Sequence, residues 1–128
     1  MSVEPEGGDA TAPPSVAVRP PRRFVASGSV DGDVGVIRVV GEMDLRTADD
    51  VIDVADDLLE RGAAHVVLEC GELTFIDSSG LAVLIRLYQQ LNRDGGTLGM
   101  RNCDAFTRNV LEVTGLRRFI LDDDTVED

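Results

Sequence analysis

The feature that most constrains the fold is an alternation of short, β-branched segments with longer segments of helical periodicity. Strand patterns occupy residues 24–29, 34–40, 65–70, 98–100 and 119–121, and helix patterns begin at or near residues 47, 79 and 104. The first two strands form a hairpin around an Asp-Gly-Asp turn at residues 31–33. Because strands that alternate with helices build a largely parallel sheet, the sequence predicts an α/β fold with a mixed, mostly parallel sheet of about four to five strands.

The first helix pattern carries apolar residues on one face and acidic residues on the other. Its apolar positions are Ala48, Val51, Ile52, Ala55, Leu58 and Leu59. Thr47 precedes them and Asp50 lies three residues further on, a spacing typical of a capping box at a helix start. We therefore expect the Thr47 hydroxyl to cap this helix and its acidic face to meet solvent.

The second helix pattern has more apolar residues than one buried face requires. The expected core stripe consists of Leu81, Leu84, Ile85, Tyr88 and Leu91. Val83 and Leu87 lie away from this stripe, where an ordinary amphipathic helix places polar side chains. Either the third helix or a partner protein covers them, and we assign both residues to a partner-binding surface.

The third helix pattern is bounded by a residue suited to capping at each end. Asp104 is a favourable N-cap residue, and Gly115 suits the left-handed conformation that ends many helices. The expected apolar positions between them are Phe106, Val110, Leu111 and Val113.

The charge balance restricts the kind of partner. The 128 residues include 24 Asp and Glu against 12 basic residues, all of them Arg, for a net charge of −12. A surface this acidic repels the phosphates of nucleic acids and anionic membranes, so neither is an expected partner. Proteins with basic patches remain as partners, although a role in solubility alone would also account for the charge.

The length suggests a single domain, which we place at residues 23–122. Residues 1–22 are rich in Pro, Gly, Ala and Ser and are expected to form a disordered tail, with an acidic frayed tail at 123–128. Neither a signal peptide nor an apolar run of membrane length is visible, so we expect a cytoplasmic protein. Cys70 and Cys103 lack metal-ligand spacing, and no metal or cofactor is expected.

A polar group, Asp77-Ser78-Ser79-Gly80, directly precedes the second helix. A helix N-terminus carries unpaired N–H groups and about half a positive charge, which together stabilise a phosphate. Ser78 or Ser79 is therefore a candidate phosphate acceptor, and the alternative is that one hydroxyl simply caps the helix. Because a nucleophilic serine needs a base, and the one histidine, His65, most simply starts a strand, no enzyme activity is expected.

Three segments carry a resemblance to a known family. They are Leu-Thr-Phe-Ile-Asp-Ser-Ser-Gly-Leu at 73–81, Gly-Glu-Met-Asp-Leu-Arg-Thr-Ala at 41–48 and Val-Thr-Gly-Leu at 113–116. In this order and spacing they make the chain resemble the anti-sigma-factor antagonists, single-domain members of the STAS family. The resemblance implies the STAS fold, with helices packed mainly on one face of the sheet.

The resemblance also implies a partner-switching function in the regulation of transcription. In that family the unphosphorylated antagonist binds an anti-sigma factor, itself a serine kinase that uses ATP, and so frees a sigma factor. The kinase then phosphorylates the first serine after the aspartate, here Ser78, which abolishes binding, and a serine phosphatase resets the protein. Asp44 corresponds to the family's aspartate that lies near the phosphorylation site and assists partner binding.

The expected partner-binding residues follow from these motifs and from the surplus apolar positions of the second helix. They are Asp44, Thr47, Asp77, Ser78, Ser79, Gly80, Val83 and Leu87. We expect a monomer or a weak dimer. The alternative function is that of a non-switching STAS subunit in a larger stress-sensing or transporter-associated complex.

Overall fold

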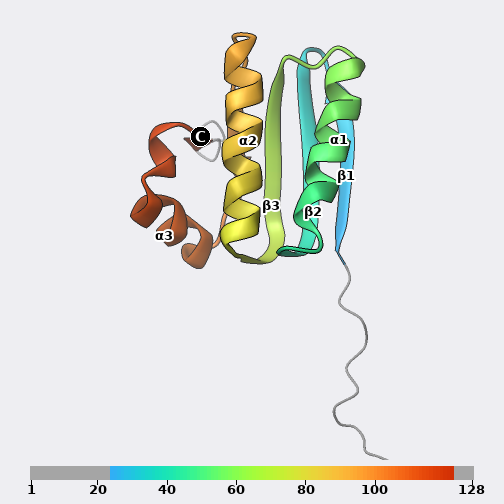
Figure 1. Cartoon of the computed structure of the whole chain (residues 1–128). Helices are drawn as coiled ribbons and strands as arrows, with labels where there is room; N and C mark the ends of the chain where they lie inside the picture. Colours follow the sequence, from blue (N-terminus) through green and yellow to red (C-terminus); the bar gives the residue numbers. More distant parts are fainter. Residues whose placement is uncertain (1–23, 123–128) are drawn as a thin grey trace, which may run out of the picture.

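The computed structural model describes residues 24–122, so the predicted tails at 1–22 and 123–128, and residue 23 at the predicted domain start, lie outside the described residues. The elements in chain order are β1 (Val25–Asp31), β2 (Val34–Met43), α1 (Ala48–Glu60), β3 (His65–Ile76), α2 (Ser78–Arg93), β4 (Leu98–Arg101), α3 (Ala105–Thr114), the 3₁₀ turn η1 (Leu116–Arg118) and β5 (Leu121–Asp122). Figure 1 shows α1 and α2 side by side in front of the sheet, with α3 at one edge.

The strands form one sheet in the order β1-β2-β3-β4-β5. β1 and β2 are an antiparallel hairpin, whereas β2, β3, β4 and β5 pair in parallel. Asp31 pairs with Val34, so the turn consists of Gly32 and Asp33, and Gly32 takes a φ of 65°. The predicted α/β fold with a mixed, mostly parallel sheet is confirmed.

α1 packs closely on the hairpin because glycines face it. A Cβ atom added to Gly28 would lie 2.8 Å from Val54 Cγ1, and one added to Gly35 would lie 3.0 Å from Leu58 Cδ1. An added methyl group at either position would require these side chains to shift. The two glycines therefore allow α1 to bury its apolar face, including Val51 and Leu58, against the sheet.

β2 and β3 both extend further than their sequence patterns predict. β2 continues to Met43 and β3 to Ile76, where the sequence predicted ends at residues 40 and 70. Two register shifts interrupt their pairing, the second directly after Gly41, whose φ is 106°. Irregularities of this kind disturb the alternation of buried and exposed side chains that marks a strand. The pairing resumes beyond them and places Met43 opposite Ile76.

α2 buries a face that only partly matches the predicted one, since Leu84 and Leu91 are buried as expected. Val83 and Leu87 expose 5% and 0% of their surface and belong to the core with Leu84 and Leu91, whereas Ile85, expected in the core, is 39% exposed. The helix is apolar over two adjacent faces, so periodicity alone does not decide which face meets the sheet. The assignment of Val83 and Leu87 to a partner-binding surface is therefore wrong, because the fold itself covers them.

η1 partly covers the second apolar face of α2. Ile85 and Tyr88 line a hollow of about 290 Å³ together with Leu116 and Phe119. The rings of Tyr88 and Phe119 lie 5.3 Å apart between centroids. Because η1 occupies residues 116–118, β5 starts at Leu121, two residues later than the strand that the sequence predicts.

α3 has the predicted ends but buries fewer apolar residues than expected. The Asp104 carboxylate accepts a hydrogen bond from the backbone N–H of Thr107 at 2.8 Å, and Gly115 ends the helix with a φ of 78°, which confirms both predicted caps. Thr107 and Leu111 are the buried residues of this helix, whereas Phe106 and Val113 are exposed. α3 lies at the sheet edge, where one narrow strip of its surface meets the rest of the molecule.

Candidate functional site

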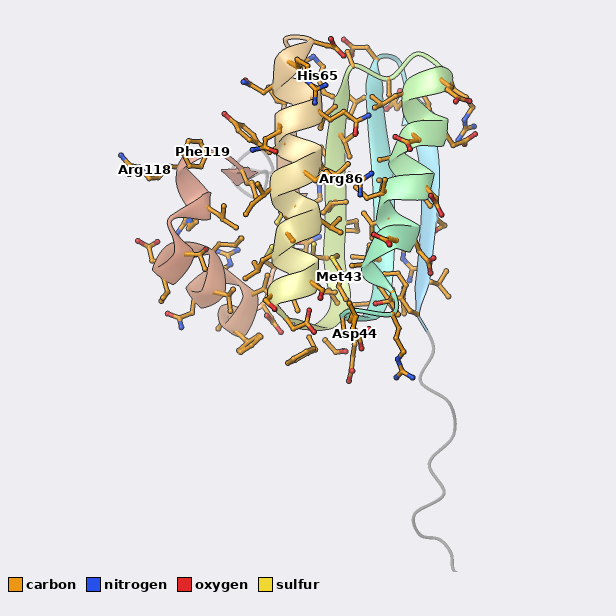
Figure 2. The ribbon with its side chains drawn as sticks, in the orientation of Figure 1. Met43, Asp44, His65, Arg86, Arg118 and Phe119 are labelled. Atoms are coloured by element: carbon orange, nitrogen blue, oxygen red, sulfur yellow. The ribbon has the colours of Figure 1, made fainter. Side chains whose placement is uncertain are left out.

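The 41–48 and 73–81 motifs meet at the carboxyl ends of β2 and β3. Met43 and Ile76 are paired in register, and the backbone N–H of Asp77 donates a hydrogen bond to the Met43 carbonyl at 3.2 Å. The next residue of each strand, Asp44 or Asp77, therefore begins a loop at the same edge of the sheet. Figure 2 shows Met43 and Asp44 at this end, near the beginnings of α1 and α2.

Asp77 is the N-cap of α2. Its Oδ1 atom accepts hydrogen bonds from the backbone N–H groups of Ser79 at 2.8 Å and Gly80 at 3.2 Å. This is the bonding pattern that favours Asp at a helix start. Neither serine supplies the cap, so the alternative that gave this task to Ser78 or Ser79 is wrong. Ser78 is exposed and Ser79 is half-buried, which makes Ser78 the more accessible hydroxyl.

Gly80 allows α2 to begin directly against the strand ends. A Cβ atom at this position would lie 2.6 Å from Ile76 Cγ1 and 2.8 Å from the Met43 carbonyl oxygen. The latter is a backbone atom and has little freedom to retreat. Gly80 is buried, so it serves the site through the close approach of its backbone to β2 and β3 and presents no surface to a partner.

Thr47 fixes the loop that carries Asp44. Its hydroxyl accepts a hydrogen bond from the Asp44 N–H at 2.9 Å and donates one to the Glu42 carbonyl at 2.6 Å. The same side chain makes no capping bond to α1, although Thr47 occupies the N-cap position. The predicted capping role is therefore wrong, because the hydroxyl is directed back toward the loop. Asp44 also accepts from the Arg46 N–H at 3.0 Å, which orders its carboxylate.

The first turn of α2 has little backbone capacity left for another anion. Asp77 already engages two N–H groups through its side chain, and its carbonyl accepts from the Leu81 N–H at 2.9 Å. A phosphate on Ser78 would therefore add its charge beside an existing carboxylate and face solvent. Since phosphorylation adds about 1.5–2 negative charges, its main effect would be on the binding of another molecule at this end of the sheet.

His65 lies at the far end of β3 from Ser78. It is the first residue of that strand, and Figure 2 shows it at the edge opposite Met43 and Asp44. Its Nδ1 atom accepts a hydrogen bond from the Thr97 backbone N–H at 3.1 Å. The imidazole therefore has a structural contact and cannot reach Ser78 as a general base.

Within 24–122, no cluster of three or more His, Cys, Asp or Glu side chains is arranged to hold a metal ion. None of the helices in the same part of the chain combines the length and the apolar character that a bilayer crossing needs.

Sequence reasoning missed exposed apolar residues near the site. The strand predicted at 65–70 ends before Phe75, and Phe106 is one of the apolar positions expected in the third helix, yet 39% and 49% of their respective surfaces are exposed. Leu45, in the loop after Met43, is exposed as well. For Phe75 a signal was available, because three apolar residues, Leu73, Phe75 and Ile76, continue the strand pattern directly before Asp77.

The model of the STAS domain family matches residues 28–128. The chain therefore belongs to the STAS domain family, and the sheet, the helices and the Asp77 to Gly80 turn described above are its version of that domain. It is similar to the anti-sigma F factor antagonist of Paenibacillus polymyxa, with 33% identity over 82 residues, covering 63% of this chain and 70% of the relative.

Two solved structures are similar in fold. An anti-sigma factor antagonist from Mycobacterium paratuberculosis superposes with a TM-score of 0.68 at 23% identity, covering 81% of this chain and 90% of that one. The Bacillus cell fate determinant SpoIIAA in its phosphorylated form gives a TM-score of 0.61 at 22% identity, covering 78% of this chain and 90% of that one. At these identities the likeness establishes the shared fold.

Proposed function

We propose that this chain is an anti-sigma factor antagonist whose partner binding is switched by a phosphate on Ser78. The observation that carries the proposal is an exposed Ser78 hydroxyl that has no capping duty, because Asp77 performs it, beside the loop of Asp44. A relative named as an anti-sigma factor antagonist and a phosphorylated structure of the same fold support it. The partner is an anti-sigma factor that acts as a serine kinase with ATP, and a serine phosphatase removes the phosphate.

The switch rests on the cost of burying an unmatched anion. In the unphosphorylated state, Asp44 and Asp77 attract a basic surface on the kinase, and Ser78, the residue after Asp77, is a small neutral group. The phosphate adds charge and bulk at a point where the interface has no spare cation. Dehydrating such a group when the interface closes costs on the order of several kcal/mol, which is enough to release the partner.

The partner is to be identified first by affinity capture with three baits: the wild type, Ser78→Ala and Ser78→Asp. We expect a serine kinase that is retained by the wild type and by Ser78→Ala and lost with Ser78→Asp. The purified kinase and ATP should then add one phosphate to the wild type, located on Ser78 by mass spectrometry.

Ser79→Ala is the matched control for this experiment. It removes the adjacent, half-buried hydroxyl and should still accept the phosphate on Ser78. In a binding titration, Ser78→Asp should lose affinity by about tenfold or more relative to Ser78→Ala, since each 1.4 kcal/mol of lost binding energy corresponds to a factor of ten. Equal affinity of the two variants would contradict the switch.

A further inference from the structure

Two phenylalanine rings are stacked on the surface close to the phosphorylation site. Phe75 is the penultimate residue of β3, and Phe106 is the second residue of α3. Their ring centroids are 6.3 Å apart with an angle of 15° between the planes. We call these two residues the aromatic pair. Because a Phe side chain is among the largest apolar groups available for burial, two half-exposed rings in contact make a pronounced apolar feature.

The aromatic pair lies at the same end of the sheet as Ser78, where β2 and β3 finish. Phe75 precedes Ser78 by only two intervening residues and is paired in register with Glu42, next to the Asp44 loop. Phe106 lies at this end as well, because α3 begins there, directly after its cap Asp104. The aromatic pair and the candidate switch therefore lie at the same end of the sheet.

Carboxylates flank the aromatic pair. Asp77 and Asp104, which cap α2 and α3, follow Phe75 and precede Phe106 by two residues each, and Asp44 lies on the neighbouring loop. An apolar centre with a charged rim is the usual anatomy of a protein interface, and aromatic residues are often its energetic centre. A partner that complements this surface would present an apolar side chain flanked by Arg or Lys.

We propose that the aromatic pair is the apolar anchor by which this chain binds its anti-sigma factor, while Ser78 beside it controls whether binding occurs. The inference rests on the proposed function, since the occupant is the kinase named there. A second copy of this chain is a poor occupant, because a symmetric contact through this edge would bring Asp44, Asp77 and Asp104 of two copies together, and like charges facing each other at an interface are costly.

Phe119 supplies a matched control for the test. It has the same exposed fraction as Phe106, 49%, and likewise contacts another ring, that of Tyr88. Figure 2 shows Phe119 toward the opposite end of the molecule from Asp44. Phe106→Ala and Phe119→Ala therefore remove the same group from equally exposed sites, one inside the proposed surface and one outside it.

The experiment measures the affinity of the unphosphorylated variants for the purified kinase by calorimetry, with thermal unfolding of each variant recorded alongside. Phe106→Ala should weaken binding by about tenfold or more, as expected for an aromatic residue at the centre of an interface, and Phe119→Ala by less than about threefold. Phe75→Ala provides an independent second removal from the same pair and should match Phe106→Ala.

The outcomes separate this inference from the proposed function. If Ser78→Asp abolishes binding while Phe106→Ala and Phe75→Ala bind normally, the anchor is refuted and the switch stands. If Phe106→Ala weakens binding and Ser78→Asp does not, the anchor survives and the switch fails. Equal losses for Phe106→Ala and Phe119→Ala, or self-association of the wild type that Phe106→Ala abolishes, would overturn the anchor.

Discussion

The helices α1 and α2 begin at the same end of the sheet and cover the same face, yet their first turns are built differently. α1 carries Asp49 and Asp50 in its first turn and receives no capping bond from the Thr47 side chain. α2 has no acidic residue in its first turn and is capped by Asp77 from outside the helix. A helix N-terminus can be neutralised in either way. The arrangement in α2 leaves Ser78 without a task in the fold, which suits a position that is to be modified.

The remaining surfaces of the two helices differ in charge. α1 contains six acidic residues and no basic residue, whereas α2 contains Arg86 and Arg93 and no acidic residue. A hydrogen bond from the Gln90 side chain to Asp56 joins the two helices at 3.3 Å. Of the two helices, α1 therefore carries the acidic charge, and the negative charge near Ser78 comes from the loop residues Asp44 and Asp77. Four sets of substitutions test this comparison.

Leu87→Ala should have the largest effect, lowering the free energy of unfolding by about 3 kcal/mol, because a fully buried leucine leaves a cavity when it is truncated. Leu58→Ala is the matched control in α1, since Leu58 is equally buried, and it should lose a similar amount. Urea unfolding measures both. If Leu87→Ala costs less than about 1 kcal/mol while Leu58→Ala costs the full amount, α2 does not bury the face described here.

Gly80→Val should cost about 2–3 kcal/mol, because the new side chain meets the Met43 carbonyl and Ile76 in a space that is already filled. Ala82→Val introduces the same residue two positions later at an exposed site of α2 and should cost less than about 1 kcal/mol. Thermal unfolding of the two variants gives the comparison. Similar losses would mean that helix propensity, and not the close approach to β2, explains the glycine.

Asp77→Ala should lower stability by about 1 kcal/mol through loss of the α2 cap, and Asp104→Ala should do the same for α3. Asp77→Asn retains a capping oxygen and should be close to the wild type, because Asn is a comparable N-cap residue. The three variants can be compared by their midpoints in urea. If Asp77→Ala were as stable as the wild type, Asp77 would not be a stabilising cap of α2, and Ser78 could not be said to be free of that role.

Ser78→Asp should have the smallest effect on the free protein, less than about 1 kcal/mol in either direction, because attraction to the helix N-terminus is offset by repulsion from Asp77. Asp49→Asn, which removes a charge already present in the first turn of α1, should destabilise by about 0.3–1 kcal/mol. Thermal unfolding in low salt resolves the two. If Ser78→Asp were strongly destabilised, its loss of partner binding would be explained by unfolding and not by the added charge.

The sequence predicts the fold class and the ends of α3 because these depend on local signals. Alternating strand and helix patterns indicate a largely parallel sheet, and Asp104 and Gly115 have backbone preferences that act within one turn. The meeting of the 41–48 and 73–81 motifs depends instead on β2–β3 pairing that resumes after register shifts. The register shifts interrupt the alternating pattern on which the strand predictions depend, and both strands are accordingly longer than predicted.

The role of each site residue was harder to predict than its membership of the site. Thr47, Ser78 and Ser79 are all acceptable N-cap residues, so propensity does not show which of the available oxygens makes each bond. The geometry decides that Asp77 caps α2 and that Thr47 fixes the Asp44 loop. The rotation of α2, which buries Leu87, likewise depends on how tightly α1 and η1 pack beside it.

The site forms only when the chain folds, because it depends on the pairing of Met43 with Ile76. Between these residues the chain passes through all of α1 and nearly all of β3, so the two loops meet only after a contact between distant parts of the sequence has formed. Such contacts carry a loop-closure cost and tend to form slowly. A peptide of residues 73–81 contains the serine motif without the neighbouring strand. A kinase that contacts both loops would therefore phosphorylate only molecules in which β2 and β3 have paired. Phosphorylated protein would then be folded protein.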